Sequence, residues 1–318
     1  MANHLIIGLG GTGGKIIREF RKRIYEEFRT LEPGEGVHID YVYVDSSTED
    51  LNDRKDWKVM GKSVHLGEAQ KVNINGVNAS MLDNIKMYPG LEAFLNGEDV
   101  RMMRGEKMGP LITAGIGGQR RRLGGTLIAN NMSDKNNSLN FEATVRSAVQ
   151  RLQQNSSDQS VNFHICAGLA GGTGSGSIVD AVSLIRKWFY NPQDPKTFKV
   201  RLMVYMPEQT MVHTNHDAGF YQANGYAALS ELNAMSVGKY HPVDIMGEKE
   251  LFGDRAQRLL QNQDAFEACY IYSNVNEYGK TLELTQELPS VVANFLLKVY
   301  LMVTDILLLL EVLESLMM

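Results

Sequence analysis

Short apolar runs alternate with longer amphipathic segments along most of the chain. Alternating or continuous apolar residues predict buried strands at 4–8, 37–45, 161–167, 199–206 and 268–272. Apolar residues that recur every three or four positions predict helices at 15–28, 141–152, 177–190 and 223–235. Because strands and helices alternate, we expect an α/β fold in which a Rossmann-like parallel sheet carries helices on both faces.

Two regions depart from this alternation. Between residues 51 and 108 the pattern is polar and weak, and it predicts only some helical character near 81–105. The segment 285–318 is the most apolar in the chain, but Lys298 and Asp305 interrupt it. A membrane-spanning helix needs about 20 consecutive apolar residues. We therefore expect a long, buried apolar helix and no direct membrane span.

Composition narrows the class of protein. The chain has 318 residues, of which 43% are hydrophobic and 22% charged, as in ordinary globular proteins. Its net charge of −5 argues against a nucleic-acid partner, so any phosphate site must be local. Cys166 and Cys269 lie in apolar runs without metal-ligand spacing, and the first residues lack the pattern of a secretory signal. These features predict a cytoplasmic protein.

Three glycine clusters lie where a strand or loop leads into a predicted helix. They read G-L-G-G-T-G-G at 8–14, G-I-G-G-Q-R-R-R-L-G-G at 115–125 and A-G-G-T-G-S-G at 170–176. Glycine enters positive-φ conformations without steric cost, so such loops can turn several backbone N–H groups toward one anion. Thr173 and Ser175 add hydroxyl donors. The candidates for phosphate binding are Gly8, Gly10, Gly11, Thr12, Gly13, Gly117, Gly118, Gly171, Gly172, Thr173, Gly174, Ser175 and Gly176.

The first cluster by itself also fits other functions. It satisfies G-x-G-x-x-G between a strand and a helix, which is typical of dinucleotide-binding enzymes. Asp45 ends the next predicted strand, although it lies later than the ribose-binding acid of that motif. A tight turn that packs a helix on a sheet is a third interpretation. Three glycine clusters on one sheet supply more donors than these alternatives need, and they favour a nucleoside triphosphate.

The first and last clusters resemble those of the tubulin/FtsZ superfamily. Residues 8–14 look like the opening glycine loop of FtsZ, and 170–176 is similar to the tubulin/FtsZ signature. The closest resemblance is to bacterial tubulin-like proteins that are neither true FtsZ nor eukaryotic tubulin. It implies GTP or GDP bound with Mg²⁺. It also places Asp45, in the segment after the second strand, near the nucleotide and its magnesium ion.

The resemblance implies further nucleotide contacts. Gln119 and Arg120 replace an Asn-Pro-Glu step of FtsZ, and arginines there could neutralise a γ-phosphate or lie on a solvated face. Asn274 ends a predicted strand as the family's ribose- or base-contacting Asn does. Glu208 is not carried over from the family, but its position after the predicted strand at 199–206 predicts contact with the ribose. Asn294 matches the central-helix position that contacts guanine. Ser290 stands where an aromatic residue would stack on the base, so the chain departs from the family's pattern at this position.

Hydrolysis in this superfamily needs a loop after the central helix, which reaches the nucleotide of the next subunit. Glu311 and Glu314 have the family's acid spacing but lie among leucines without the preceding Asn. We therefore assign no catalytic residue. The sequence predicts a GTP-binding domain at 1–284 and a central-type helix and terminus at 285–318, without the family's C-terminal activation domain.

The function expected from the resemblance is nucleotide-dependent self-assembly into filaments. A neighbouring subunit, a missing domain or another partner would supply the catalytic acids. Two alternatives stay open: an NAD(P)-dependent oxidoreductase on a Rossmann sheet, and a nucleotide-binding scaffold that does not polymerise. His213 and Asp217 could suggest a metal site, but a polar loop explains them better and we assign no protein metal ligands.

Overall fold

The computed structural model describes residues 2–33, 36–75, 83–95, 121–134, 136–194, 197–208, 221–247 and 257–302. Its centre is a six-stranded parallel sheet with the strand order β5-β2-β1-β6-β7-β8. The strands are β1 (Ala2–Leu9), β2 (Val37–Asp45), β5 (Lys71–Asn73), β6 (Val161–Gly168), β7 (Phe198–Tyr205) and β8 (Ala268–Tyr272). A separate antiparallel pair joins β3 (Lys58–Val59) to β4 (Lys62–Ser63). The predicted Rossmann-like parallel sheet is confirmed.

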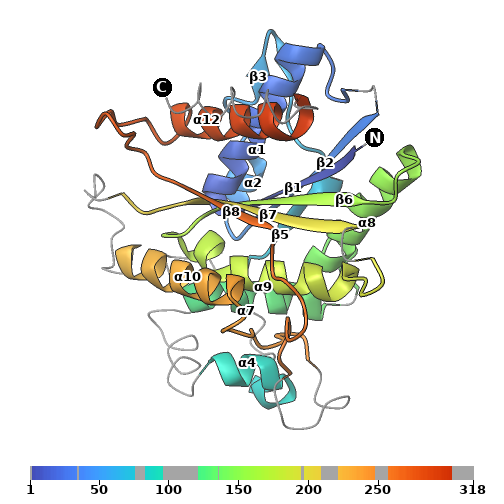
Figure 1. Cartoon of the computed structure of the whole chain (residues 1–318), viewed down its shortest axis with the longest axis vertical. Helices are drawn as coiled ribbons and strands as arrows, with labels where there is room; N and C mark the ends of the chain where they lie inside the picture. The colour runs from blue at the N-terminus through green and yellow to red at the C-terminus, as the bar shows by residue number, and fades with distance from the viewer. Residues whose placement is uncertain are drawn as a thin grey trace.

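Helices cover both faces of this sheet (Figure 1). One face carries α1 (Gly10–Phe28) and α12 (Glu287–Leu296), and α12 leads into a π-helical turn, η3 (Leu297–Met302). The other face carries α7 (Arg121–Ser133), α8 (Phe141–Asn155), α9 (Gly172–Phe189) and α10 (Tyr221–Ser236). The shorter elements are α2 (Thr48–Asn52), α4 (Pro89–Phe94) and the 3₁₀ turns η1 (Glu68–Gln70) and η2 (Ile85–Met87).

The strands are apolar on both sides because each face of the sheet packs on its own core. On β1, Leu5 and Ile7 belong to the core under α9, whereas Ile6 between them belongs to the core under α1. The residues paired with Ile6, Tyr41 on β2 and His164 on β6, extend this second face. A parallel sheet buried in this way reads as a continuous apolar run in the sequence.

The largest differences from the predicted elements concern the helix starts. We expected helices from residues 15 and 177, but α1 begins at Gly10 and α9 at Gly172. The glycine clusters are therefore the first turns of helices rather than separate loops. The last segment also differs, because α12 ends at Leu296 and gives way to the π-helical turn, while residues 303–318 lie outside the described part of the chain.

Within the described ranges, no helix combines the length and the apolar character that crossing a membrane would require.

Candidate nucleotide site

Helices α1 and α9 begin side by side at the carboxyl edge of the sheet, following the adjacent strands β1 and β6. A Cβ atom added to Gly10 would lie 3.1 Å from the backbone nitrogen of Gly174 and 3.3 Å from Cβ of Thr173. Neither N-cap residue, Leu9 or Gly171, provides a side-chain hydrogen bond to its helix. Unsatisfied first-turn N–H groups and the positive helix ends therefore meet at one place, an arrangement suited to an anion.

The glycines of these two turns fall into two kinds. At Gly8, Gly13 and Gly174 an added Cβ atom would lie within 2.8 Å of backbone atoms, for example 2.6 Å from the carbonyl oxygen of Cys166 at Gly13. Glycine at these positions lets the first turns of the helices pack directly against the strands. At Gly11 and Gly171 an added Cβ atom would meet nothing within 4 Å. Glycine there leaves the backbone open to a ligand.

Positive backbone angles contribute less than expected. Among the site glycines that the structure describes, Gly10 has a φ of +70°, and those of the β6–α9 turn all have negative φ. The predicted nest of left-handed glycines is thus limited to one position. The helix N-termini themselves supply most of the donors that point toward the edge.

The middle glycine cluster is described only in part. Gly117, Gly118, Gln119 and Arg120 lie outside the described residues, so their predicted roles stay predictions. Gly124, in the first half of α7, is described and buried. A Cβ atom added there would lie 2.5 Å from the carbonyl oxygen of Gly172 and 3.0 Å from Cα of Gly176. Helix α7 therefore packs tightly on the first turn of α9.

Asp45 ends β2 at the same edge and is almost fully buried. Its Oδ2 atom accepts a hydrogen bond of 2.9 Å from the Tyr43 hydroxyl, and Oδ1 accepts one of 3.1 Å from the Ser47 backbone N–H. Gly14 makes room for this arrangement, because a Cβ atom there would lie 2.4 Å from the Tyr43 ring. Burial raises the pKa of Asp45 to about 6. No ion pair joins Asp45 to any residue in the described ranges, although a buried carboxylate favours a cation beside it.

Hydroxyl and amide side chains tie the β6–α9 turn to its neighbours. Ser46, after β2, hydrogen-bonds Thr173 through the two hydroxyl oxygens, 2.8 Å apart. The Ser175 hydroxyl is fully buried and donates to the backbone oxygen of Asn224 on α10 at 3.3 Å. The Asn224 amide in turn donates to the Ala170 carbonyl oxygen at 3.1 Å. Thr173 thus lies at the edge, whereas Ser175 holds α10 against α9.

A cavity of about 170 Å³ opens beside the helix starts, toward β7 and β8. Five elements line it: α1, the ends of β7 and β8, α10 and the start of α12. The lining residues are Thr12, Lys15, Ile16, Tyr205, Glu208, Tyr221, Tyr272, Leu284, Leu288 and Pro289. Thr12 belongs to the first turn of α1, so the cavity adjoins the anion site.

The polar groups of the cavity have shifted acidity. Burial is the first cause that raises the pKa of Tyr205 and of Tyr272, and burial also lowers the pKa of Lys15. The Tyr221 hydroxyl donates to Oε2 of Glu208, the residue predicted to contact the ribose. Lys15 and these tyrosines belong to no sequence motif and were not among the predicted site residues. Tyr205 and Tyr272 could have been recognised by their position, because they end strands and ligands of α/β sheets bind beyond the carboxyl ends of the strands.

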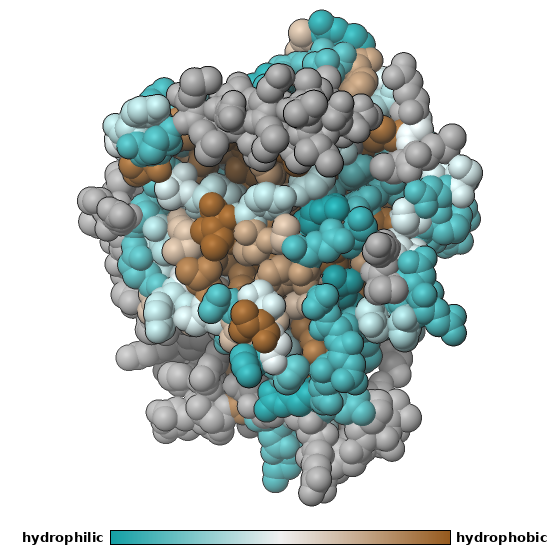
Figure 2. All heavy atoms as spheres, viewed as in Figure 1, coloured by the Kyte–Doolittle hydropathy of each residue, from teal (hydrophilic) through white to brown (hydrophobic). Residues whose placement is uncertain are grey.

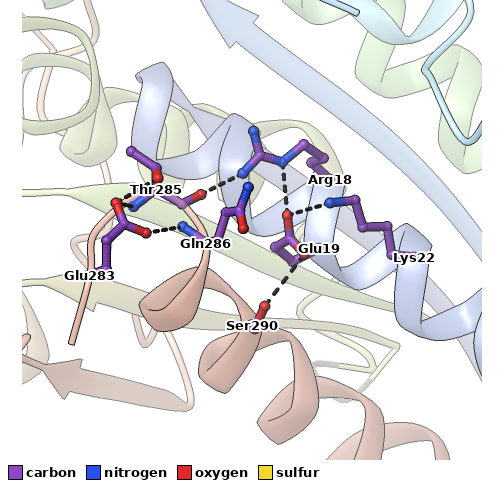
Figure 3. Close-up of polar contacts among 7 residues, drawn as sticks. All are labelled: Arg18, Glu19, Lys22, Glu283, Thr285, Gln286 and Ser290. Carbon is purple, nitrogen blue, oxygen red and sulfur yellow. Dashed lines mark hydrogen bonds and ion pairs between the residues drawn. The ribbon is translucent and has the colours of Figure 1, made fainter. Parts of the chain in front are cut away.

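A polar network fixes the α12 side of the cavity against α1 (Figure 3). Glu19 accepts hydrogen bonds from Arg18 at 2.8 Å and Lys22 at 2.9 Å, and a longer one of 3.4 Å from Ser290 on α12. Arg18 also donates to the Thr285 carbonyl oxygen, and Glu283 accepts from the backbone N–H of Gln286 at 2.7 Å. This network positions the segment that carries Leu284 and Leu288.

The two asparagines predicted to contact ribose or base lie away from the cavity lining. Asn274 follows β8, is 8% exposed, and its backbone oxygen accepts from Leu282 at 2.7 Å. Asn294 is half-buried in α12. Neither residue lines the cavity. Their roles in recognition stay predictions.

No cluster of three or more His, Cys, Asp or Glu side chains suited to a metal occurs in the part of the chain that the structure describes. His213 and Asp217 lie outside that part.

A family model described as tubulin like matches residues 5–305. The chain belongs to this tubulin-like family. The likeness to the tubulin/FtsZ superfamily predicted from the glycine motifs is thereby confirmed. A search of the curated proteins finds no match.

Solved structures of CetZ and TubZ proteins resemble the fold of this tubulin-like chain. CetZ1 from Haloferax volcanii, described as a GDP-bound monomer, is 15% identical with a TM-score of 0.51, and the match covers 99% of this chain and 64% of CetZ1. CetZ from Methanosaeta thermophila is 12% identical, with a TM-score of 0.49 and coverage of 100% and 60%. TubZ from Bacillus thuringiensis, in a GTPγS-form protofilament, is 11% identical, with a TM-score of 0.44 and coverage of 93% and 55%. The chain thus spans less than two thirds of the length of these relatives.

Proposed function

We propose that this tubulin-like chain binds GTP and GDP with Mg²⁺ and assembles with copies of itself in a nucleotide-dependent way. The observation that carries the proposal is the convergence of two uncapped helix N-termini, those of α1 and α9, at the carboxyl edge of the sheet. Membership of the tubulin-like family supports the guanine nucleotide and the self-assembly.

The phosphates would lie against the first turns of α1 and α9. Gly11 and Gly171 face open space there, so backbone N–H groups can approach phosphate oxygens without obstruction from a side chain. The Thr173 hydroxyl lies at the same edge and can donate as well. The cavity next to Thr12 would take the base.

Asp45 is the residue that fits a magnesium ion. It is a buried carboxylate at the phosphate edge, it has no ion pair within the described ranges, and a pKa of about 6 leaves it largely ionised at neutral pH. Magnesium is usually held by one or two carboxylates together with substrate phosphates and water. When bound, the ion would neutralise phosphate charge.

Hydrolysis would be completed by groups from a neighbouring subunit or from another partner. We propose residues 1–284 as the nucleotide-binding domain and α12, which adds Leu288 and Pro289 to the cavity wall, as the start of the family's central helix. Glu311 and Glu314 lie outside the described residues.

The proposal is tested by the nucleotide that the purified protein retains. Chromatography of the denatured protein should release GTP or GDP, and light scattering should rise with GTP more than with GDP. In Gly171→Val, the new side chain fills the open space at the phosphate edge, and the nucleotide should be lost while the melting temperature is kept. Gly67→Val is the matched control, because Gly67 has nearly the same backbone angles (φ −73°, ψ 162° against −73°, 169°) away from the site.

Recovery of NAD, or equal nucleotide content in both glycine variants, would contradict nucleotide binding at this edge. Retained GDP without any rise in light scattering would contradict self-assembly but not nucleotide binding.

A further inference from the structure

Lys15 is a cation of the cavity without a partner among the described residues. It lies on α1, one residue beyond the first glycine cluster, and is half-buried. No hydrogen bond or ion pair links its ammonium group to any residue in the described ranges. The carboxylates of Asp50, Glu283 and Glu208 attract it at longer range. Removing an ammonium group from water without hydrogen-bond acceptors is unfavourable, so the structure leaves Lys15 ready for acceptors that a ligand would bring.

The surroundings of Lys15 suit a flat ring. Tyr205, Tyr221 and Tyr272 reach the cavity from three different elements, and Leu288 adds apolar surface from α12. A cavity of about 150 Å³ accepts benzene, so one of about 170 Å³ has room for a flat heterocycle but not for a whole nucleotide. Aromatic side chains stack on bases of any sequence because every base has a π-face. The tyrosines would therefore hold a base without selecting which one.

We propose that Lys15 selects guanine by donating hydrogen bonds to the O6 and N7 atoms of the base, an inference that rests on the nucleotide function proposed above. Guanine presents two acceptors on this edge, whereas adenine presents N7 and an amino donor at position 6. An ammonium group has three donors and no acceptor. Lys15 therefore matches guanine and opposes the adenine amino group.

A competing role for Lys15 is general attraction of phosphate. Gly11, at the open helix start, lies four residues before Lys15 and thus on the same face of α1, one turn away. A lysine that bound phosphate would strengthen binding of every nucleotide equally, and of pyrophosphate too. A lysine that reads the base gains the O6 acceptor only with guanine, because adenine presents N7 beside an amino donor, so the two roles predict different ligand profiles.

Lys15→Met tests the proposal, because methionine keeps an unbranched apolar stem and removes the donors. Calorimetric titration of nucleotide-free protein would compare GDP, ADP, inorganic pyrophosphate and the diphosphate of 2-aminopurine riboside, which lacks O6. We expect the wild type to prefer GDP over the 2-aminopurine analogue by about tenfold to a hundredfold, and Lys15→Met to reduce this ratio to about one. Affinity for ADP and pyrophosphate should stay within about twofold.

Two further variants control the experiment. Arg23→Met removes a positive charge from the same helix outside the cavity, where Arg23 pairs with Glu26 at 2.7 Å, and should keep the guanine preference. Lys15→Arg retains donors and should restore most of it, which also covers the case in which the methionine variant does not fold.

An equal loss of GDP, ADP and pyrophosphate affinity in Lys15→Met would overturn the base-reading role, as would an unchanged GDP preference. A wild-type protein that binds none of the nucleotides would overturn the proposed function together with this inference. One that binds GDP with no help from Lys15 would overturn this inference alone.

Discussion

Strands β1 and β6 pass through two regions of opposite character. Gly8 and Gly168 lie near the carboxyl ends of these strands, where few side chains are present. The backbone there either faces open space or packs closely on a neighbouring element. His4 and His164 lie four residues earlier on the same strands. Both rings are buried, and Nδ1 of His4 is 3.0 Å from Nε2 of His164. One pair of strands thus carries a site made of backbone and a cluster made of side chains.

The histidine cluster continues toward α12 and η3. The His164 ring lies 4.7 Å from that of Tyr300, measured between centroids, and the Tyr300 hydroxyl donates to that of Tyr270 at 2.7 Å. The Arg201 guanidinium lies 4.7 Å from the centre of the Tyr300 ring. Aromatic and imidazole side chains therefore fill this part of the core. Part of the neighbouring surface over β8 is apolar, and Ile271 is 53% exposed there (Figure 2).

The comparison shows two ways to use a parallel strand pair. A polyanion site needs free N–H groups, so it tolerates no side chain where the ligand approaches and no extra atom where helix and strand meet. The histidine cluster instead depends on neutral, well-packed rings.

Gly13→Ala should be the most damaging single change at the edge. The new Cβ atom would lie 2.6 Å from the Cys166 carbonyl oxygen and from backbone atoms of Gly8, which belong to the central strands and cannot move aside. We expect a loss of about 4 kcal/mol in the free energy of unfolding. Urea denaturation measures it.

Gly11→Ala is the matched control for this change, since an added Cβ atom there meets nothing within 4 Å. It should leave stability unchanged or raise it by about 0.5 kcal/mol, because alanine favours a helix over glycine. Equal losses in the two variants would show that the distinction between packed and open glycines is wrong.

The histidine cluster should make stability depend on pH. Burial lowers the pKa of His4 to about 4 and that of His164 well below its ordinary value, so both rings stay neutral in the folded chain. As the pH falls below about 6.5, the unfolded chain binds protons that the folded chain does not. The free energy of unfolding should therefore fall by about 3 kcal/mol from His4 alone between pH 6.5 and 4.

Urea titrations at several pH values, on the wild type and on His4→Gln, isolate this effect. The difference between the two profiles is needed because Asp45, with a raised pKa of about 6, titrates in the same range with the opposite sign. The variant should show a shallower fall toward pH 4. Identical slopes would mean that His4 does not couple folding to protons.

Much of this architecture could be predicted from the sequence. The runs at 37–45 and 268–272 coincide with β2 and β8, because alternating or continuous apolar residues mark a strand in the sequence. The glycine motifs correctly indicated the family. Strand β5 was missed, since three residues in a polar stretch carry too little periodicity.

The site was predictable where backbone chemistry dominates and less so elsewhere. Glycine spacing indicated the edge at which α1 and α9 begin, but it could not show which glycines are open and which are packed, because that depends on strands distant in sequence. Lys15, Asn224 and the cavity tyrosines had no motif of their own. Their proximity arises from five elements meeting at one edge, which is a property of the fold.

Asn224→Ala should weaken the edge moderately. Its side-chain amide donates a hydrogen bond to the Ala170 carbonyl oxygen, and its backbone oxygen accepts one from the Ser175 hydroxyl. The side chain therefore stabilises the β6–α9 turn from α10. Loss of this buried hydrogen bond should cost about 1 to 2 kcal/mol of stability and loosen nucleotide binding. Asn233→Ala, at an exposed position of the same helix, should change neither quantity. An equal effect of both substitutions would locate the loss in the helix itself.

The smallest effect is expected for Asn294→Ala, and it decides between two assignments of base recognition. The family resemblance gives Asn294 the guanine edge, whereas in the structure this residue is half-buried in α12 and does not line the cavity that contains Lys15 and the tyrosines. If the cavity reads the base, the ratio of GDP to ADP affinity should change less than about threefold and stability by less than about 0.5 kcal/mol. Val291→Ala, at an exposed position of the same helix, gives the background for such a change. A tenfold fall in the ratio for Asn294→Ala alone would instead place recognition on α12, and the base would then have to lie nearer that helix than the cavity indicates.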